Sequence, residues 1–184
     1  MNILKVVCAA TLLSALYGSA SYAADNPMVG GAAMYPTKNI VENAMNSQDH
    51  TTLVAAVKAG DLVDTLQGAG PFTVFAPTNE AFAALPAGTV DTLLKPENKG
   101  LLDKILTYHV VPGTYDTARL DQMIADGGGR AELKTVQGDI LTIMGRGDHL
   151  SVTDDKGNTA MITISNVYQS NGVILVVDKV LMPN

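Results

Sequence analysis

The segment from Gly70 to Phe82 constrains the fold more than any other part of this sequence. It reads Gly-Pro-Phe-Thr-Val-Phe-Ala-Pro-Thr-Asn-Glu-Ala-Phe. The β-branched and aromatic residues 72–76 predict a short buried strand, which ends at Pro77 because proline has no N–H for a ladder hydrogen bond. Thr78 stands where a helix N-cap belongs, and the residues after it predict a short helix that ends before Pro86. We therefore expect this segment to bring a strand into the core and to return as a capped helix.

Three blocks of the sequence, including this one, resemble the signature of a known domain family. Residues 73–82, residues 106–113 (Leu-Thr-Tyr-His-Val-Val-Pro-Gly) and residues 171–183 (Asn-Gly-Val-Ile-Leu-Val-Val-Asp-Lys-Val-Leu-Met-Pro) are similar, in this order, to the first, central and last motifs of fasciclin-type (FAS1) domains. The resemblance covers nearly the whole chain after Pro36 and implies a FAS1 fold. Within the first and last blocks it implies a set of fold-signature residues: Phe75, Pro77, Thr78, Asn79, Phe82, Asn171, Gly172 and Asp178.

The first two thirds of the sequence predict mainly helices. Apolar residues recur with the spacing of helices that face a core, and we expect helices over residues 40–45, 49–60, 61–68, 89–94, 96–106 and 116–125. Thr37 or Asn39 is placed to cap the first of these helices, and Asp49 to cap the second. Met45 and Leu101 belong to the apolar stripes that we expect to be buried.

The last third of the chain changes to the period of β-strands. We expect strands around Leu133 and over residues 140–143, 150–153, 160–165 and 173–177, where alternation of apolar and polar residues is clear in the third and fourth runs. Residues 173–177 are apolar throughout and should be central. The prediction is an α+β fold, a mostly antiparallel β-sandwich or wedge with a helical layer from the first half of the chain.

The beginning of the sequence has the pattern of an export signal. Lys5 precedes the apolar run Val6–Leu16, and Ser21-Tyr22-Ala23 fits a cleavage site. The run is much shorter than the roughly 20 apolar residues that span a bilayer as a helix, which disfavours a retained anchor. We expect a signal peptide over residues 1–23, a flexible lead-in over 24–36 and one FAS1 domain over 37–184. The mature chain would then have no stable membrane span and would be periplasmic or extracellular.

Cysteine content and charge restrict the chemistry further. Cys8, the only cysteine, lies within the predicted signal peptide, so the mature chain would have neither a disulfide nor a thiol. The net charge is −6, and removal of Lys5 would make it one unit more negative. An acidic chain without a basic stripe repels phosphate backbones, so we expect no nucleic-acid binding.

Tyr108 and His109 form the most suggestive pair of titratable residues. A phenol and an imidazole could share a proton-transfer role. However, residues 108–111 read as a strand, on which adjacent side chains point to opposite faces. The alternative is a buried, hydrogen-bonded His109 that locks the strand to a neighbouring loop, with Tyr108 on the other face. The resemblance links this motif to fold integrity and adhesion.

Arg146-Gly147-Asp148 is a tripeptide that animal integrins recognise, and it lies at an expected hairpin tip. The alternative is an ordinary surface turn, because Gly and Asp are common turn residues. The last family block departs from its usual pattern at Leu175, where members usually carry His. Upstream, Asn166-Val167-Tyr168 replaces an Asp-Ile-type adhesion motif of some animal members, so metal-dependent integrin recognition there is not supported.

Metal, cofactor and catalytic patterns are nearly absent from the sequence. His50, His109 and His149 lie far apart, and no His or Cys pair has metal-ligand spacing. Residues 154–158 (Asp-Asp-Lys-Gly-Asn) predict a Gly-containing turn, because they lack the alternating oxygen ligands of a calcium loop. Neither a nucleophile elbow nor a phosphate loop occurs. We expect no metal and no cofactor.

The function that the resemblance implies is adhesion or extracellular protein–protein interaction by an exported, non-enzymatic domain. Its partner would be a cell-surface or matrix-type protein or glycan, and the sequence does not fix the oligomeric state. The alternative is a periplasmic protein that binds a small apolar ligand between helices and sheet, which the eight methionines would permit. A deep apolar cavity would favour this alternative, and a solid core would remove it. A hydrolase that uses His109 is a third and weaker hypothesis.

Overall fold

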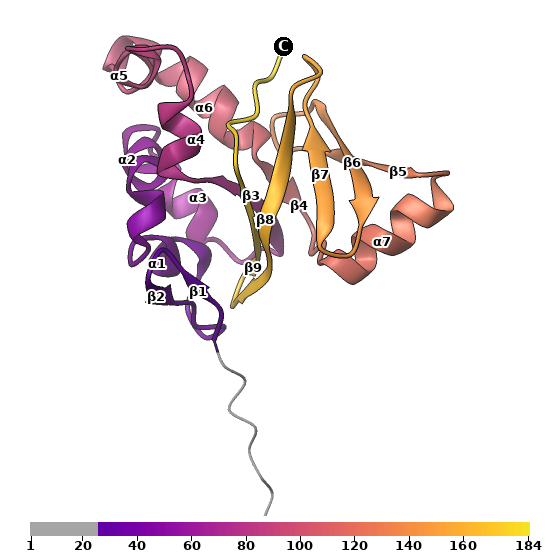
Figure 1. Ribbon diagram of the computed structural model, residues 1–184. Coiled ribbons are helices and arrows are strands. Elements are labelled where there is room, and N and C mark those ends of the chain that lie inside the picture. The colour runs from indigo at the N-terminus through magenta and orange to yellow at the C-terminus, as the bar shows by residue number, and fades with distance from the viewer. Residues whose placement is uncertain (1–25) are drawn as a thin grey trace, which may run out of the picture.

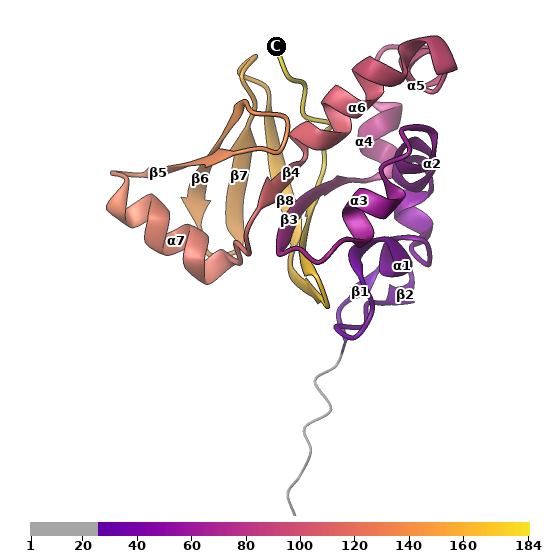
Figure 2. The same ribbon diagram turned by 180° about the vertical axis from the view of Figure 1, so that it is seen from behind.

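The computed structural model describes residues 26–184, and the predicted signal peptide lies outside these residues. One side of the molecule is a layer of helices, and the other side is a curved β-sheet with a further helix at its far end (Figures 1 and 2). The helices are α1 (Ile40–Ala44), α2 (Thr51–Ala59), α3 (Val63–Gln67), α4 (Asn79–Ala83), α5 (Thr89–Leu93), α6 (Lys99–Tyr108) and α7 (Thr117–Asp126), with 3-10 turns at Gln48–His50 and Pro96–Asn98.

The strands form one small hairpin and one seven-stranded sheet. Their bounds are β1 (Met28–Val29), β2 (Ala32–Ala33), β3 (Phe72–Pro77), β4 (Val110–Pro112), β5 (Arg130–Lys134), β6 (Ile140–Arg146), β7 (His149–Thr153), β8 (Thr159–Gln169) and β9 (Gly172–Val177). The large sheet has the order β4-β3-β9-β8-β7-β6-β5, in which only the β3–β9 pair is parallel. Its two ends approach each other, because the Val136 N–H, just after β5, donates to the Val110 carbonyl of β4 at 2.8 Å. The mostly antiparallel sheet is therefore barrel-like, and the predicted α+β class is confirmed.

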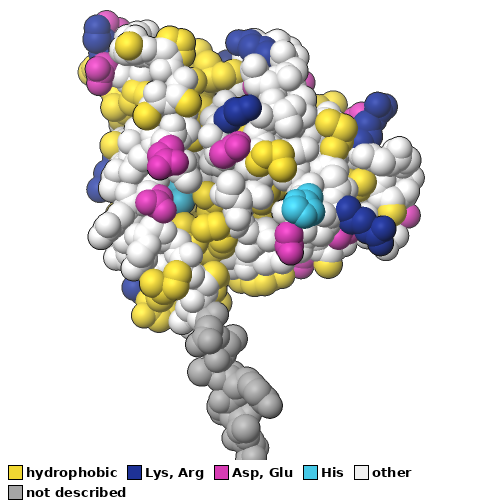
Figure 3. Space-filling view, in the orientation of Figure 1, with side chains coloured by type: hydrophobic (Ala, Val, Ile, Leu, Met, Phe, Trp, Pro, Cys, Tyr) yellow, Lys and Arg dark blue, Asp and Glu magenta, His cyan; other side chains and the backbone are white. Residues whose placement is uncertain are grey.

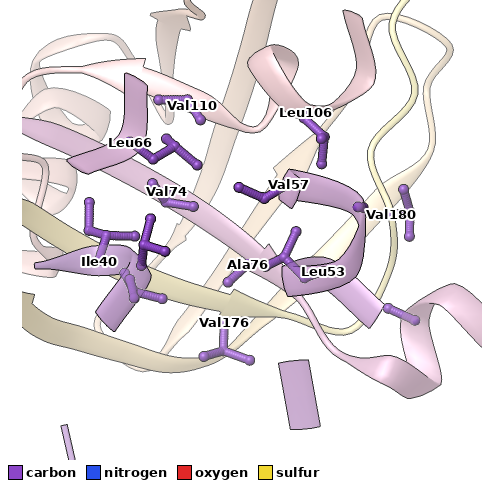
Figure 4. Close-up of a cluster of buried hydrophobic side chains, with 14 of the residues drawn as sticks. Ile40, Leu53, Val57, Leu66, Val74, Ala76, Leu106, Val110, Val176 and Val180 are labelled. Carbon is purple, nitrogen blue, oxygen red and sulfur yellow. The ribbon is translucent and has the colours of Figure 1, made fainter. Parts of the chain in front are cut away.

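Alternate residues of the parallel pair face two separate hydrophobic cores. Val74 and Val176 face the helical layer, in a cluster that we call the helix-side core (Figure 4). Phe75 and Leu175, which are paired in register, face the interior of the curved sheet, which we call the barrel core. Because successive side chains of a strand point to opposite faces, an apolar run such as residues 173–177 can be buried on both sides.

The segment expected to be a flexible lead-in is structured from residue 28 onward. β1 and β2 pair across Gly30 and Gly31, and the Gln48 N–H donates to the Gly30 carbonyl at 3.1 Å. Met34 is only 1% exposed and belongs to the helix-side core. Strands of two residues are too short to show a period in the sequence, which is why the segment read as irregular.

The expected strand over residues 108–111 begins two residues later, and that prediction was wrong at its start. α6 continues to Tyr108, and His109 caps its C-terminal end. Tyr108 and His109 lie three and four residues after Ile105 and so continue the helical period of the apolar stripe, although Tyr and His are only modest helix formers. The β-branched pair Val110–Val111 then starts β4.

Three smaller predictions also fail. Met45 and Leu101 are 53% and 51% exposed, because each lies at the border of its helix's apolar stripe. Asp49 lies within the 3-10 turn and does not cap α2, whose N-cap position is His50. By contrast, Asn39 caps α1 with a complete capping box, and Thr78 accepts a hydrogen bond from the Ala81 N–H at the start of α4.

Candidate functional site

Tyr108 is fully buried in the barrel core at the end of α6. Its hydroxyl donates to the Ile140 carbonyl at 3.1 Å and accepts from the Asp155 N–H at 3.0 Å. Burial raises the pKa of Tyr108 to about 12, because desolvation disfavours the phenolate. The neutral phenol therefore connects the end of α6 to the start of β6 and to the β7–β8 turn.

His109 is also buried, and both of its ring nitrogens have backbone partners. Nδ1 lies 2.8 Å from the Ile105 carbonyl oxygen, and Nε2 lies 3.0 Å from the Leu181 amide nitrogen. A carbonyl can only accept and an amide N–H can only donate, so the ring is neutral with its proton on Nδ1. Burial lowers the pKa of His109 to about 4, against weaker opposing effects of the Ile105 carbonyl and the Asp154 carboxylate.

The two side chains do not form a catalytic dyad. The Tyr108 hydroxyl and the His109 ring share no hydrogen-bond partner, and neither has a free polar atom to present to a substrate. Within residues 26–184, no three His, Cys, Asp or Glu side chains are grouped as metal ligands would be. What the pair does is to hold α6 against the sheet and against the end of the chain.

Asp154 completes this arrangement, although the sequence indicates only a turn residue there. Its buried carboxylate accepts from the N–H groups of Asn158 at 2.8 Å and Lys156 at 3.0 Å within the β7–β8 turn, and from the Met182 N–H at 3.0 Å. Asp at the start of a Gly-containing turn predicts the first two bonds. The third joins segments far apart in the sequence, and no local pattern indicates it.

The asparagines of the first and last blocks link separate elements. Asn79 accepts from the Thr52 N–H at 3.0 Å and donates to the Gln48 carbonyl at 2.8 Å, so α4 supplies a cap to α2. Asn171 accepts from the Ile40 N–H at 3.0 Å and donates to the Leu66 carbonyl at 2.7 Å, which ties α1 and α3 to the β8–β9 turn.

The remaining signature residues lie within the same framework. Phe75 and Phe82 are buried, and Pro77 ends β3. Asp178 accepts from the Met161 N–H at 2.7 Å. A side chain at Gly172 would place its Cβ 2.0 Å from the Phe72 carbonyl oxygen, so the parallel β3–β9 contact requires glycine there.

Comparison with known proteins agrees with this geometry. The family model of the fasciclin domain matches residues 48–183. The chain belongs to the fasciclin domain family. A FAS1 domain pair from the insect cell adhesion molecule fasciclin I has the same fold, with a TM-score of 0.72 at 16% sequence identity. That match covers 80% of this chain and 51% of the other, so this chain spans about half of the domain pair.

Several bacterial proteins are similar over most of this fasciclin domain. Protein sll1483 of Synechocystis sp. is 47% identical over 156 residues, which cover 85% of this chain and 79% of that protein. The cell surface glycolipoprotein MPB83 of Mycobacterium bovis is 39% identical over 90% of this chain and 70% of its own length. The immunogenic protein MPB70 of the same species is 40% identical over 90% of this chain and 80% of its own length.

The two places at which the resemblance to the family motifs is incomplete have defined environments in the structure. Leu175 is fully buried beside Phe75 in the barrel core, an apolar position without polar neighbours on its strand. Asn166 lies in a bulged part of β8 with a φ of +56°, and its amide bonds both the N–H and the hydroxyl of Thr117 at the start of α7. The Asn166 side chain thus holds the start of α7 against the sheet.

Tyr168 and the β6–β7 tip are exposed features of the fasciclin domain. Tyr168 is 46% exposed, and its hydroxyl donates to the Asp116 carboxylate at 3.0 Å, which fixes the ring. At the β6–β7 tip, Arg146 and Asp148 are exposed, whereas the Gly147 N–H donates to the Asp121 carboxylate of α7 at 2.9 Å. Acidic, basic and apolar side chains are interspersed over the face seen in Figure 3.

The interior of the fasciclin domain offers little space for a ligand. Three apolar cavities beside β3, in the region between the helices and the sheet, have volumes of about 30 to 40 Å³ each. Pockets for small molecules usually have about 300–1,000 Å³. The region between the helices and the sheet is therefore almost completely filled, which weighs against the alternative of a protein that binds a small apolar ligand there. No helix among residues 26–184 has the length and apolar character needed to cross a membrane.

Proposed function

We propose that this fasciclin domain is an exported, non-enzymatic scaffold that mediates adhesion or protein–protein contact at a cell surface or in the extracellular space. The observation that carries the proposal is the complete engagement of Tyr108 and His109 in backbone hydrogen bonds. The titratable pair of the central family motif is thereby used for structure, which leaves recognition to the surface.

The similar proteins support the location and the class of function. MPB83 is by name a cell surface glycolipoprotein, and the structurally similar domain pair comes from a cell adhesion molecule. The leader pattern of residues 1–23 supports export. The partner that we propose is a cell-surface or matrix-type protein or glycan, in keeping with an acidic domain that has mixed surface chemistry.

The proposed contact surfaces are Tyr168 and the Arg146–Asp148 tip. Interfaces draw much of their binding energy from Tyr and Arg, and a ring already fixed by Asp116 loses little entropy when it is covered. Both features project from rigid strands whose positions the cores determine.

The experiment is retention of envelope components from the producing cell on beads that carry the chain from residue 24. The test variants are Tyr168→Ser and the pair Arg146→Ala with Asp148→Ala, and the control is Lys95→Ala, an exposed residue near the distant α5. We expect specific retention that at least one test variant reduces and the control does not. Equal retention by beads that carry an unrelated acidic protein, at several salt concentrations, would refute the proposal.

A further inference from the structure

The last seven residues form a strap that joins the two cores. Residues 178–184, which we call the C-terminal strap, have no regular secondary structure and run past β8 and α6 at the end of the yellow chain in Figure 1. The side chain of Val180 is buried in the helix-side core, whereas that of Leu181 is buried in the barrel core. The strap therefore covers the seam between the cores without belonging to the sheet.

Two buried side chains hold the middle of the C-terminal strap. The Leu181 N–H donates to Nε2 of His109 at 3.0 Å, and the next amide, Met182 N–H, donates to the Asp154 carboxylate at 3.0 Å. At the start of the strap, the Asp178 N–H donates to the Met161 carbonyl of β8 at 3.2 Å, and the Asp178 carboxylate accepts from the Met161 N–H at 2.7 Å. Exposed side chains add two contacts, from Lys104 to the Asn184 carbonyl and from Lys179 to the Thr159 carbonyl.

The bond between Leu181 and His109 exists only while the imidazole is neutral. Nδ1 carries the ring proton because it donates to Ile105, so the next proton must bind at Nε2. Protonated Nε2 would face the Leu181 N–H with a hydrogen of its own. The bond would then be lost, and a charge would be buried without a direct partner.

The charged groups around His109 do not offset the cost of burying a protonated imidazole. Asp154 is the carboxylate whose charge reaches the ring, and it favours the protonated form only weakly compared with burial. On α6 and on the strap, the charged Lys104 and Lys179 bond the Asn184 and Thr159 carbonyls and not the ring, and the apolar Val74 and Phe75 of β3 and Val110 of β4 line the same small cavity as His109. No carboxylate bonds the imidazole in the structure.

We propose that the C-terminal strap is an acid-released latch, in which protonation of His109 detaches Leu181 and opens the seam between the two cores while the sheet stays intact. This inference goes beyond the proposed function and does not depend on it. The sheet can persist because its seven strands pair with one another, whereas the strap bonds the backbone of β8 only near its start, where the Asp178 N–H donates to the Met161 carbonyl at 3.2 Å. An opened strap would uncover the apolar positions of Val180 and Leu181.

The test is amide hydrogen exchange, between pH 7 and pH 4, of the full domain without the predicted signal peptide. The rates are corrected for the intrinsic pH dependence of exchange. For a ring with a pKa of about 4 in the closed state and 6.5 in the open state, the opening constant should rise about 100-fold over this interval. We expect this rise at Leu181 and Met182, with Leu175 in β9 and Ile143 in β6 remaining protected.

A matched variant separates titration of His109 from other effects of acid. Gln in the His109→Gln variant can accept from Leu181 without titrating, so the strap should exchange equally at both pH values. If this variant does not fold, the ¹⁵N signals of the wild-type ring decide, since they report its tautomer and its titration. The proposal would be overturned if the rise in exchange persists in His109→Gln or if the strap stays closed at pH 4. It would also be overturned if β6 and β9 lose protection together with the strap, or if the neutral ring carries its proton on Nε2.

Discussion

Asn79 supplies to helix α2 the cap that the helix lacks, with its side-chain oxygen 3.0 Å from the Thr52 N–H. The residue at the N-cap position of α2 is His50, whose side chain makes no capping bond. A signature residue of the first block, nearly thirty positions away along the chain, therefore does the work of a local cap. The contact places α2 and α4 together over β3.

Replacing Asn79 with Ala should destabilise the domain by about 1–2 kcal/mol, because the first-turn amide of α2 loses its acceptor. Urea unfolding would measure the change. The control is Asn98→Ala, a half-buried residue whose side chain makes one solvent-exposed hydrogen bond, to the Thr92 carbonyl, and for which we expect about 0.5 kcal/mol or less. Equal losses in the two variants would contradict the capping role.

Gly172→Ala should cost about 3 kcal/mol, because the new Cβ would overlap the Phe72 carbonyl oxygen and push β3 away from β9. Gly100→Ala in α6 is the matched control, since the same methyl group there meets no other atom within 4 Å. It should stabilise the domain by about 0.5–1 kcal/mol through helix propensity. Thermal unfolding of both variants would test the prediction, and a tolerated Gly172→Ala would show that the parallel pair is not tightly constrained.

His50 should make the domain less stable as the pH falls below the ordinary histidine range. Burial lowers the pKa of His50, against weaker opposing effects of the Ala76 carbonyl and of Asp49. The unfolded state therefore takes up a proton first, so the stability contributed by the neutral ring is complete above pH 6.5 and is lost as the pH falls toward the lowered pKa. Nε2 of His50 has no hydrogen-bond partner among the described residues, and Nδ1 lies 2.9 Å from the Ser47 hydroxyl.

The double variant Ser47→Ala, His50→Leu removes both members of this buried pair. Replacing both partners by apolar groups is nearly neutral or stabilising, so we expect stability at pH 7 within about 1 kcal/mol of the wild type or above it. The part of the pH dependence that comes from His50 should disappear. Denaturant unfolding at several pH values would measure both effects, and an unchanged slope would assign the pH dependence to other groups.

Much of the fold was accessible from the sequence where the signal is local. Thr78 as a cap, the strand 72–76 and the five later strands follow from side-chain chemistry and periodicity. The pairing of β3 with β9 was not accessible, because residues about one hundred positions apart carry no local sign of parallel register.

The candidate site was likewise predictable from the sequence only in part. The burial of His109 follows from its apolar surroundings, but the extension of α6 through Tyr108 does not, because helix packing outweighs modest propensity there. Asp154 is indicated as a turn residue, whereas its bond to Met182 depends on where the chain ends in space. Tertiary hydrogen bonds of single side chains are the part that sequence patterns do not reveal.

The claim that Tyr108 and His109 serve the fold and not recognition is tested most directly in the variants Tyr108→Phe and His109→Ala. In each variant, the free energy of unfolding and the binding of envelope components are both measured. Tyr108→Phe leaves the part-buried Ile140 carbonyl and Asp155 N–H without their side-chain partner, and we predict a loss of about 1–2 kcal/mol. His109→Ala leaves two buried backbone groups without a partner and also leaves a cavity, so we predict a loss of about 3–4 kcal/mol. Envelope binding per folded molecule should stay at the wild-type level in both. A wild-type melting temperature combined with lost binding or lost turnover would contradict the account, because the pair would then act on a partner or substrate.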